Sequence, residues 1–272
     1  MIEHDALSVL LGGFIGAILA LTGAGGGIIA VPVLIFGLGL SMNQAAPIAL
    51  LAVGLSASIG ALLGLRQRVV RYRAAAAIAA VGVAVAPLGI SIAQRVPNAP
   101  LALAFAVVLM GTCLRMLHEA IRGSGNSQQS KKRESMACVL NPVGGRLRWT
   151  LPCFRALTFT GLLSGMLSGL LGVGGGFVIV PALTRCTNLD TKSITATSLA
   201  VIALVSSGSV VGAALTSTLN WQIGIPFAAG AVLGLIGGRH VADHLAGPRL
   251  QQAFSVTGIF AAALLAHHAL SQ

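Results

Sequence analysis

Two glycine-rich stretches hold the residue types from which a binding site could be built. The first is Thr22-Gly23-Ala24-Gly25-Gly26-Gly27, and the second is Gly172-Val173-Gly174-Gly175-Gly176. Each glycine destabilises a helix by about 1 kcal/mol relative to alanine, so both stretches should interrupt the apolar helices around them. Backbone N–H groups at the start of a helix can bind a small anion. In the hydrocarbon core of a membrane, backbone groups without hydrogen-bond partners are tolerated only where protein or a water-filled cavity covers them. Paired breaks of this kind are typical of a transporter's substrate site.

The composition indicates a membrane protein with many spans. Of the 272 residues, 56% are hydrophobic and only 8% are charged, whereas a soluble domain carries roughly 25% charged residues. Apolar segments of about 20 residues recur along the whole chain, which is the length that crosses a bilayer as a helix. We therefore expect an all-α polytopic membrane protein with about eight or more membrane segments, and no transmembrane barrel, because period-two alternation is absent.

The net charge of +11 is best explained by cytoplasmic loops, which are enriched in Lys and Arg. Nucleic-acid binding is not expected, since only 4% of the residues are aromatic and the charge is confined to loops. Cys113, Cys138, Cys153 and Cys186 form no Cys-x-x-Cys pair. Their spacing predicts neither a zinc site nor a disulfide framework, and no cofactor is expected.

The second half of the chain repeats the first. A shift of 149 residues superimposes Gly25, Gly26 and Gly27 on Gly174, Gly175 and Gly176 without a gap. The same shift brings Val31-Pro32 onto Val180-Pro181. Internal repeats are the usual architecture of secondary transporters.

These repeats define three parts. Residues 1–121 form a first transmembrane repeat, 122–154 a basic cytoplasmic linker and 155–272 a second transmembrane repeat. Each repeat is expected to contain a helix, a glycine break, a short apolar arm and three further helices. The expected segments are 6–21, 28–39, 45–65, 74–94 and 100–121, then 156–171, 177–185, 193–216, 221–240 and 247–268.

The distribution of basic residues predicts the orientation. Residues 66–73 and 122–155 carry most of the Lys and Arg, so both should be cytoplasmic. Arg185 and Lys192 then place the turn after the second break inside, whereas the matching turn near residue 40 falls outside. The two repeats would therefore be inverted. The alternative is one crossing per broken unit, which gives parallel repeats and eight plain spans.

The break motif resembles that of a known family. A Gly-x-Gly-Gly-Gly break that leads through an apolar stretch to Pro, found twice, is similar to the TauE/SafE family of membrane permeases. Ala196-Thr197-Ser198-Leu199 is similar to that family's small-Thr-Ser-Leu signature, whereas the first repeat has Pro47-Ile48-Ala49. The resemblance covers the chain outside 122–154. It implies export or uptake of small sulfur-containing anions, such as sulfite and organosulfonates, across the bacterial inner membrane, with a site weighted toward the second repeat.

An anion site without Lys or Arg at mid-helix would depend on backbone N–H groups and hydroxyls. The glycines are the leading candidates, followed by Thr197 and Ser198. The substrate-binding residues predicted are Thr22, Gly23, Gly25, Gly26, Gly27, Asn43, Gly172, Gly174, Gly175, Gly176, Thr195, Thr197 and Ser198. Ser206 and Ser207 are further polar neighbours.

Simpler roles compete with binding for several of these residue types. Glycines in membrane helices usually permit close packing, which is the role expected of Gly12, Gly16, Gly161, Gly165, Gly230 and Gly234. Ser and Thr usually bond to carbonyls of their own helix. Glu119, Asp243, His118, His240 and His244 lie near helix ends, where an interfacial role is expected rather than proton relay.

The function predicted is therefore a secondary transporter that moves a small anion by alternating access between the two breaks. A channel for a small anion or neutral solute is the alternative, since channels also use half-helix dipoles. An enzyme is not expected: the chain has no phosphate-binding loop and no His-Glu-x-x-His, and Ser164 and Ser168 have no histidine at their depth. The expected partners are the anion and the lipid bilayer, and a homo-oligomer is compatible with the sequence.

Overall fold

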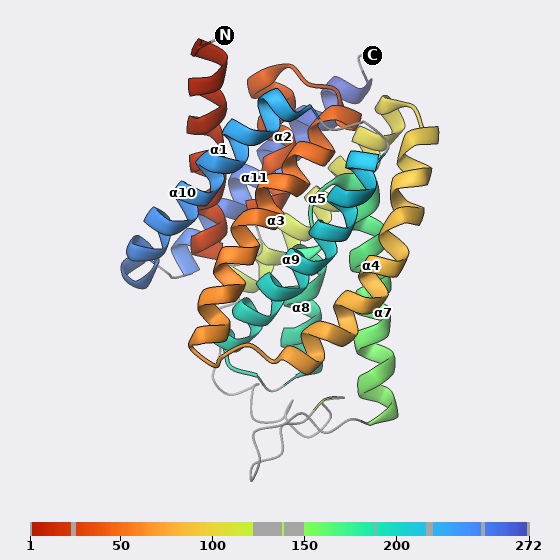
Figure 1. Ribbon diagram of the computed structural model, residues 1–272, viewed down its shortest axis with the longest axis vertical. Helices are drawn as coiled ribbons and strands as arrows, with labels where there is room; N and C mark the ends of the chain where they lie inside the picture. Colours follow the sequence, from red (N-terminus) through yellow and green to blue (C-terminus); the bar gives the residue numbers. More distant parts are fainter. Residues whose placement is uncertain are drawn as a thin grey trace.

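The computed structural model describes residues 2–22, 26–121, 138, 150–187, 189–215, 220–245 and 248–270, and these form ten α-helices (Figure 1). In the first half, α1 spans Ile2–Thr22, α2 Gly26–Leu38, α3 Met42–Arg66, α4 Tyr72–Arg95 and α5 Asn98–Ile121. In the second half, α7 spans Leu151–Leu171, α8 Gly176–Cys186, α9 Thr191–Leu215, α10 Trp221–Leu245 and α11 Pro248–Leu270. Shifted by 149 residues, the two sets of bounds agree to within one residue, so the repeat in the sequence is a repeat of helices.

Local capping explains where some helices begin. The amide oxygen of Gln44 accepts a hydrogen bond from the N–H of Ser41 at 3.3 Å, and α3 starts at the next residue. The Thr150 hydroxyl accepts from the N–H of Cys153 at 3.4 Å, and Pro152 lies in the first turn of α7. Because of this cap, α7 begins at Leu151, inside the segment assigned to the linker. The rest of that linker lies largely outside the described residues.

Within the described residues, six helices are long and apolar enough to cross a membrane. They are α3, α4, α5, α7, α9 and α10, and the apolar parts of α1, α2, α8 and α11 are shorter. Large apolar side chains such as Leu10, Val107 and Phe260 are exposed on the outer surface, as a lipid-facing surface requires. The chain is a multi-pass, all-helical membrane protein.

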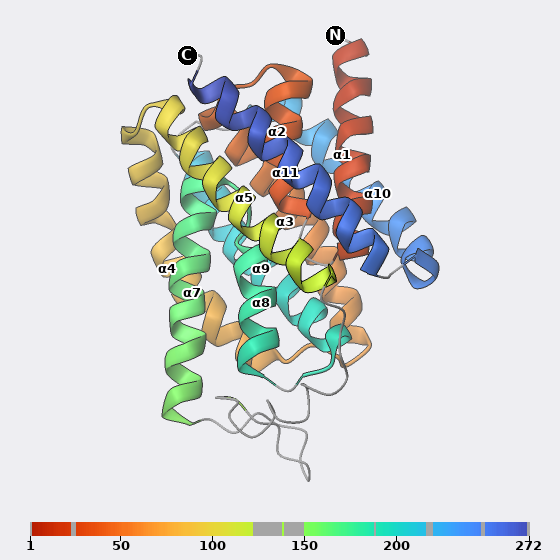
Figure 2. The same cartoon turned by 180° about the vertical axis from the view of Figure 1, so that it is seen from behind.

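The two halves pack on each other reciprocally. Helix α1 packs against α10, and its counterpart α7 packs against α4, which is the counterpart of α10. The remaining large contacts follow the same rule: α3 packs against α9, and α5 against α11. Figures 1 and 2 show that α1 and α7 run in opposite directions, each roughly parallel to its partner from the other half.

Small residues make these helix contacts close. A methyl group added at any of six glycines would overlap backbone atoms of the facing helix, as the packing role predicted for them requires. The confirmed pairs are Gly12 with Phe227, Gly16 with Ala231, Gly161 with Ile78, Gly165 with Gly82, Gly230 with Val9 and Gly234 with Gly13. The first four of these pairs are related by the 149-residue shift.

One sequence-based expectation was wrong. Cys138 and Cys153 form a disulfide, although the cysteine spacing predicted none. The N–H of Cys138 also donates to the carbonyl oxygen of Cys186 at 2.9 Å, so Cys138 is fixed to the start of α7 and to the end of α8. The pairing follows from the return of α8 to the same end of the molecule as the start of α7 (Figure 2), which spacing along the chain does not reveal.

The close contact between α4 and α7 gives a test of this packing. A methyl group at Gly165 would lie 2.6 Å from the Cα of Gly82, so Gly165→Ala should push α4 and α7 apart. We expect this change to lower the free energy of unfolding by about 1–3 kcal/mol. We expect a Tm lower by about 5 °C in detergent. Gly111→Ala is the control, because a methyl group there meets nothing within 4 Å. Equal Tm values for the two variants would contradict the packing described.

Candidate functional site

The two helix breaks meet inside the molecule. A methyl group added at Gly27, the second residue of α2, would lie 2.6 Å from the carbonyl oxygen of Val173 in the second break. Val53 of α3 contacts both, since it is 3.5 Å from the methyl position of Gly27 and 3.4 Å from that of Gly174. The breaks predicted 149 residues apart are therefore neighbours, and α3 covers them from one side.

The second break requires glycine for its backbone conformation. Gly172, Gly174 and Gly175 have φ angles of +73°, +71° and +69°, a left-handed region that residues with a side chain enter only at a cost. The N–H of Gly172 donates to the carbonyl oxygen of Ser168 at 3.0 Å and ends α7. The carbonyl of Gly175 accepts from the N–H groups of Val178 and Ile179 at 3.0 and 3.3 Å and begins α8.

The two short arms begin in the protein interior. Gly26, Gly27, Gly176 and Phe177 are all buried, and Gly175, at the N-cap of α8, provides no side-chain cap. The first N–H groups of a helix lack partners within the helix and carry about half a positive charge together. No Lys or Arg is buried among the described residues, so these helix starts are the positive groups available to an anion there.

Part of the predicted site cannot be placed. Gly23 and Gly25 lie outside the described residues, and Thr22 is the last residue of α1, with an undescribed side chain. The glycines that the structure does bring together are Gly26 and Gly27 with 172–176. A methyl group at Gly26 would lie 2.8 Å from the N and Cβ atoms of Leu19, so α2 folds back tightly on α1.

Two of the predicted hydroxyls of α9 have hydrogen-bond partners outside the breaks. The Thr197 hydroxyl accepts from the N–H of Arg71 at 3.1 Å, in the turn between α3 and α4. Ser198 donates to the carbonyl of Thr195 at 2.8 Å within its own helix. Thr197 precedes Ser206, a neighbour of the second break, by nine residues, or about 13 Å along the helix. In this conformation Thr197 therefore holds the turn at the basic end of the molecule.

Asn43 lines an opening beside the second break. This vestibule has a volume of about 150 Å³, a size that holds a benzene-sized molecule in other proteins. Asn43 and Gln94 contribute amide groups, and Gly169 and Ser209 come from α7 and α9. Ala46 also lines it and contacts Gly172, because a methyl group added at Gly172 would lie 2.7 Å from the carbonyl oxygen of Ala46. The vestibule thus leads from the start of α3 toward the second break.

The counterpart of this vestibule in the other half is filled. Pro47 and Leu50 line the vestibule across from Ser209 and Ala213. The residues 149 positions away from these four pack directly together, and they are Ala196, Leu199, Gly60 and Gly64. Methyl groups at Gly60 and Gly64 would lie 2.9 Å from Leu199 and 3.0 Å from Ala196. At these positions a cavity separates the helices at the end where α3 starts (the open end), whereas the helices are in contact at the end where α9 starts (the closed end).

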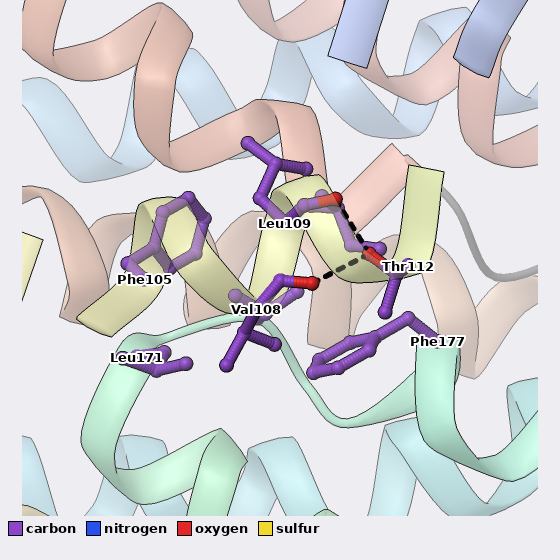
Figure 3. A pocket seen from close by; sticks show the side chains of 8 residues that line it. Phe105, Val108, Leu109, Thr112, Leu171 and Phe177 are labelled. Atoms are coloured by element: carbon purple, nitrogen blue, oxygen red, sulfur yellow. Dashed lines mark hydrogen bonds between the residues drawn. The ribbon is translucent and has the colours of Figure 1, made fainter. Parts of the chain in front are cut away.

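A second hollow beside the break is apolar. Figure 3 shows Phe105, Val108, Leu109 and Thr112 of α5 facing Leu171 and Phe177, which flank the loop of the second break. Thr112 donates within α5, to the carbonyls of Val108 and Leu109. The hollow holds about 10 Å³, too little to be a solute site. This contact seals the break on the side of α5.

Sequence reasoning did not single out a set of unpartnered hydroxyls, although it named Ser206 as a polar neighbour of the site. Among the described residues, Ser56, Ser164, Ser168 and Ser206 are fully buried and their hydroxyls have no hydrogen-bond partner. An unsatisfied buried polar group destabilises a protein by about 1–3 kcal/mol. Ser207, by contrast, donates to the carbonyl of Leu204, as serines in membrane helices usually do. Only the structure separates the two kinds of serine.

Comparison with known proteins identifies the family. The sequence model of the family described as "Sulfite exporter TauE/SafE" matches residues 8–265. The chain belongs to the TauE/SafE family. The resemblance inferred from the glycine breaks is therefore confirmed, and it extends over both halves.

Two relatives of this TauE/SafE protein come from Xylella fastidiosa, and both are named "Probable membrane transporter protein". The one from strain Temecula1 is 28% identical over 240 residues, which cover 86% of this chain and 83% of the relative. The one from strain 9a5c is 30% identical over 235 residues, with the same coverage. No solved structure matches the chain. These findings support a membrane transporter.

The crowding at Gly172 gives a test of the break. Gly172→Ala adds strain from the positive φ angle, about 1–2 kcal/mol, and overlap with the backbone of Ala46. Gly39→Ala is the matched control, since Gly39 has a φ of +66° but open space around it. We expect Gly172→Ala to have the lower Tm in detergent. A Tm equal to that of Gly39→Ala would show that α3 does not pack on the break.

Proposed function

We propose that this TauE/SafE protein is a secondary transporter for a small anion, which binds between the two glycine breaks and is carried across the membrane. The observation that carries the proposal is the meeting of the breaks, where Gly27 lies against Val173 and where α2 and α8 begin. Helix starts attract negative charge, and the low dielectric of a membrane interior strengthens that attraction. An anion could thus be held at mid-membrane without a buried Lys or Arg.

The transport mechanism proposed is alternating access by two inverted repeats. The reciprocal contacts of α1 with α10 and α7 with α4 support it, as do the opposite directions of α1 and α7 (Figure 1). Inverted repeats can exchange conformations, which opens one side of a site while closing the other. In one of these two conformations we expect a vestibule at the start of α3 and a filled counterpart at the start of α9.

The proposed substrate is a sulfur-containing oxyanion or organosulfonate. The family description names sulfite export, and a sulfur oxyanion offers several acceptor oxygens to backbone N–H groups and hydroxyls. The closed end of the molecule, where Leu199 packs on Gly60 and Thr197 on the turn at Arg71, favours a carrier over the alternative of a channel. A carrier predicts flux that saturates with substrate concentration.

The proposed location is the bacterial inner membrane, with the basic end in the cytoplasm. The turn 67–71, the start of α7 with Arg155 and the end of α8 with Arg185 lie at that end (Figures 1 and 2), and Lys and Arg concentrate on cytoplasmic surfaces. The disulfide Cys138–Cys153 lies there too. Since the cytoplasm keeps thiols reduced, this orientation predicts that the two cysteines, disulfide-bonded in the structure, are thiols in growing cells.

Filling the vestibule tests the transport proposal. Flux would be measured in liposomes that hold the purified protein, with sulfite, sulfate, thiosulfate, taurine and formate, with and without a pH gradient. Ala93 lines the vestibule, so Ala93→Trp should reduce saturable uptake at least ten-fold. Val107→Trp is the control, because Val107 is 67% exposed on the outer surface. No flux of any of these anions through the unaltered protein would refute the proposal.

Thiol labelling of single cysteines tests the orientation. Arg73 and Asn98 are both exposed and lie at opposite ends of α4 and its following turn. In intact spheroplasts, a membrane-impermeant maleimide should label Asn98→Cys and should label Arg73→Cys only after the membrane is opened. The reverse pattern would place the basic end outside and overturn the assignment.

A further inference from the structure

Three of the unpartnered serines surround the second break. Ser164 and Ser168 are one turn apart on α7, which ends three residues later at Leu171. Ser206 lies on α9, which packs against α8. All three side chains are fully buried and, within the described residues, their hydroxyls contact no hydrogen-bond partner.

Two of these hydroxyls lie directly against the start of α8. The hydroxyl oxygen of Ser206 is 3.1 Å from the methyl position of Gly174. The hydroxyl of Ser164 occupies the methyl position of Gly175, which is the N-cap of α8. Hydroxyls from two different helices therefore contact the break, at the end of α8 where backbone N–H groups lack helical partners.

The first half lacks these hydroxyls. The residues 149 positions before Ser164, Ser168 and Ser206 are Ile15, Leu19 and Ala57, all buried and apolar. The same packing positions thus accept hydrocarbon, so hydroxyl groups are not needed there to fill space. Their presence in the second half alone points to a role other than packing.

The vestibule is lined by residues close in sequence to two of these serines. Gly169, which lines it, directly follows Ser168, and Ser209 lies about one helical turn after Ser206. The hydroxyls are deeper than these lining residues, measured along α7 and α9 from the open end.

We propose that Ser164, Ser168 and Ser206, with the N–H groups at the start of α8, bind the oxygen atoms of the transported oxyanion. Each hydroxyl donates one hydrogen bond to the anion, and the N-terminus of α8 supplies positive charge. The site belongs to the second half alone, because the corresponding positions of the first half, including Leu19, are apolar. This inference rests on the proposed function, because its ligand is the transported anion.

Binding in detergent tests the inference without transport. The Tm of the purified protein would be followed with sodium sulfite and sodium methanesulfonate, against sodium chloride at equal ionic strength. A phosphine reductant would be present because sulfite attacks disulfides. A ligand that binds only the folded protein raises the Tm. We expect Ser164→Ala and Ser206→Ala to weaken the dissociation constant roughly ten-fold each, as expected for the loss of a hydrogen bond to a charged group.

A second readout separates binding from a structural role. Each Ser→Ala change removes an unsatisfied hydroxyl, so the ligand-free variants should have a Tm equal to or above that of the unaltered protein. Ser207→Ala is the matched control. Ser207 directly follows Ser206 on α9, but its side chain is exposed and its hydroxyl donates to the carbonyl of Leu204 at 2.8 Å. It should leave anion binding unchanged.

The outcomes are distinguishable. Equal stabilisation of the unaltered protein, Ser164→Ala and Ser206→Ala would overturn the hydroxyl site, as would the absence of stabilisation by both probes. Flux that persists in either case would leave the proposed function standing. Binding that depends on these serines, combined with no flux in liposomes, would support the site and reject the transporter.

Discussion

Broken helices inside a membrane need their bare backbone covered, and this requirement governs the arrangement of the whole chain. At each break the peptide groups lose their helical partners, and lipid can offer none in return. The protein meets this need by facing one break with the other, Gly27 against Val173, and by laying α3 across both. A single repeat could not do this, because its own break would face hydrocarbon.

The reciprocal packing of the two halves follows from that constraint. For the breaks to meet, α1 must leave its own repeat and pack on α10, while α7 packs on α4. Helices approach this closely only where side chains are absent, which explains the glycines at Gly12, Gly16, Gly161 and Gly165. The same closeness leaves little tolerance for added volume at this contact.

Much of this fold could be predicted from the sequence, because its main signals are local. The glycine clusters, the shift of 149 residues and the apolar lengths determine where helices start and stop, and the observed bounds differ by a few residues. What the sequence could not supply are contacts between distant segments. Thr197 has the signature of a site residue, yet it bonds to Arg71. Ser206 and Ser207 look alike in the sequence, yet only Ser206 lacks a partner. Cys138 and Cys153 pair because of how α7 and α8 pack, not because of their spacing.

The central claim is that a small oxyanion binds where the two breaks meet. The most direct measurement is a diffraction experiment on crystals grown with the selenium oxyanion, selenite or selenate, that competes with transport, using the anomalous signal of selenium. The account predicts a peak beside the start of α8, within hydrogen-bonding distance of the hydroxyls of Ser164 and Ser206. Peaks confined to the outer surface, with none between the breaks, would contradict it.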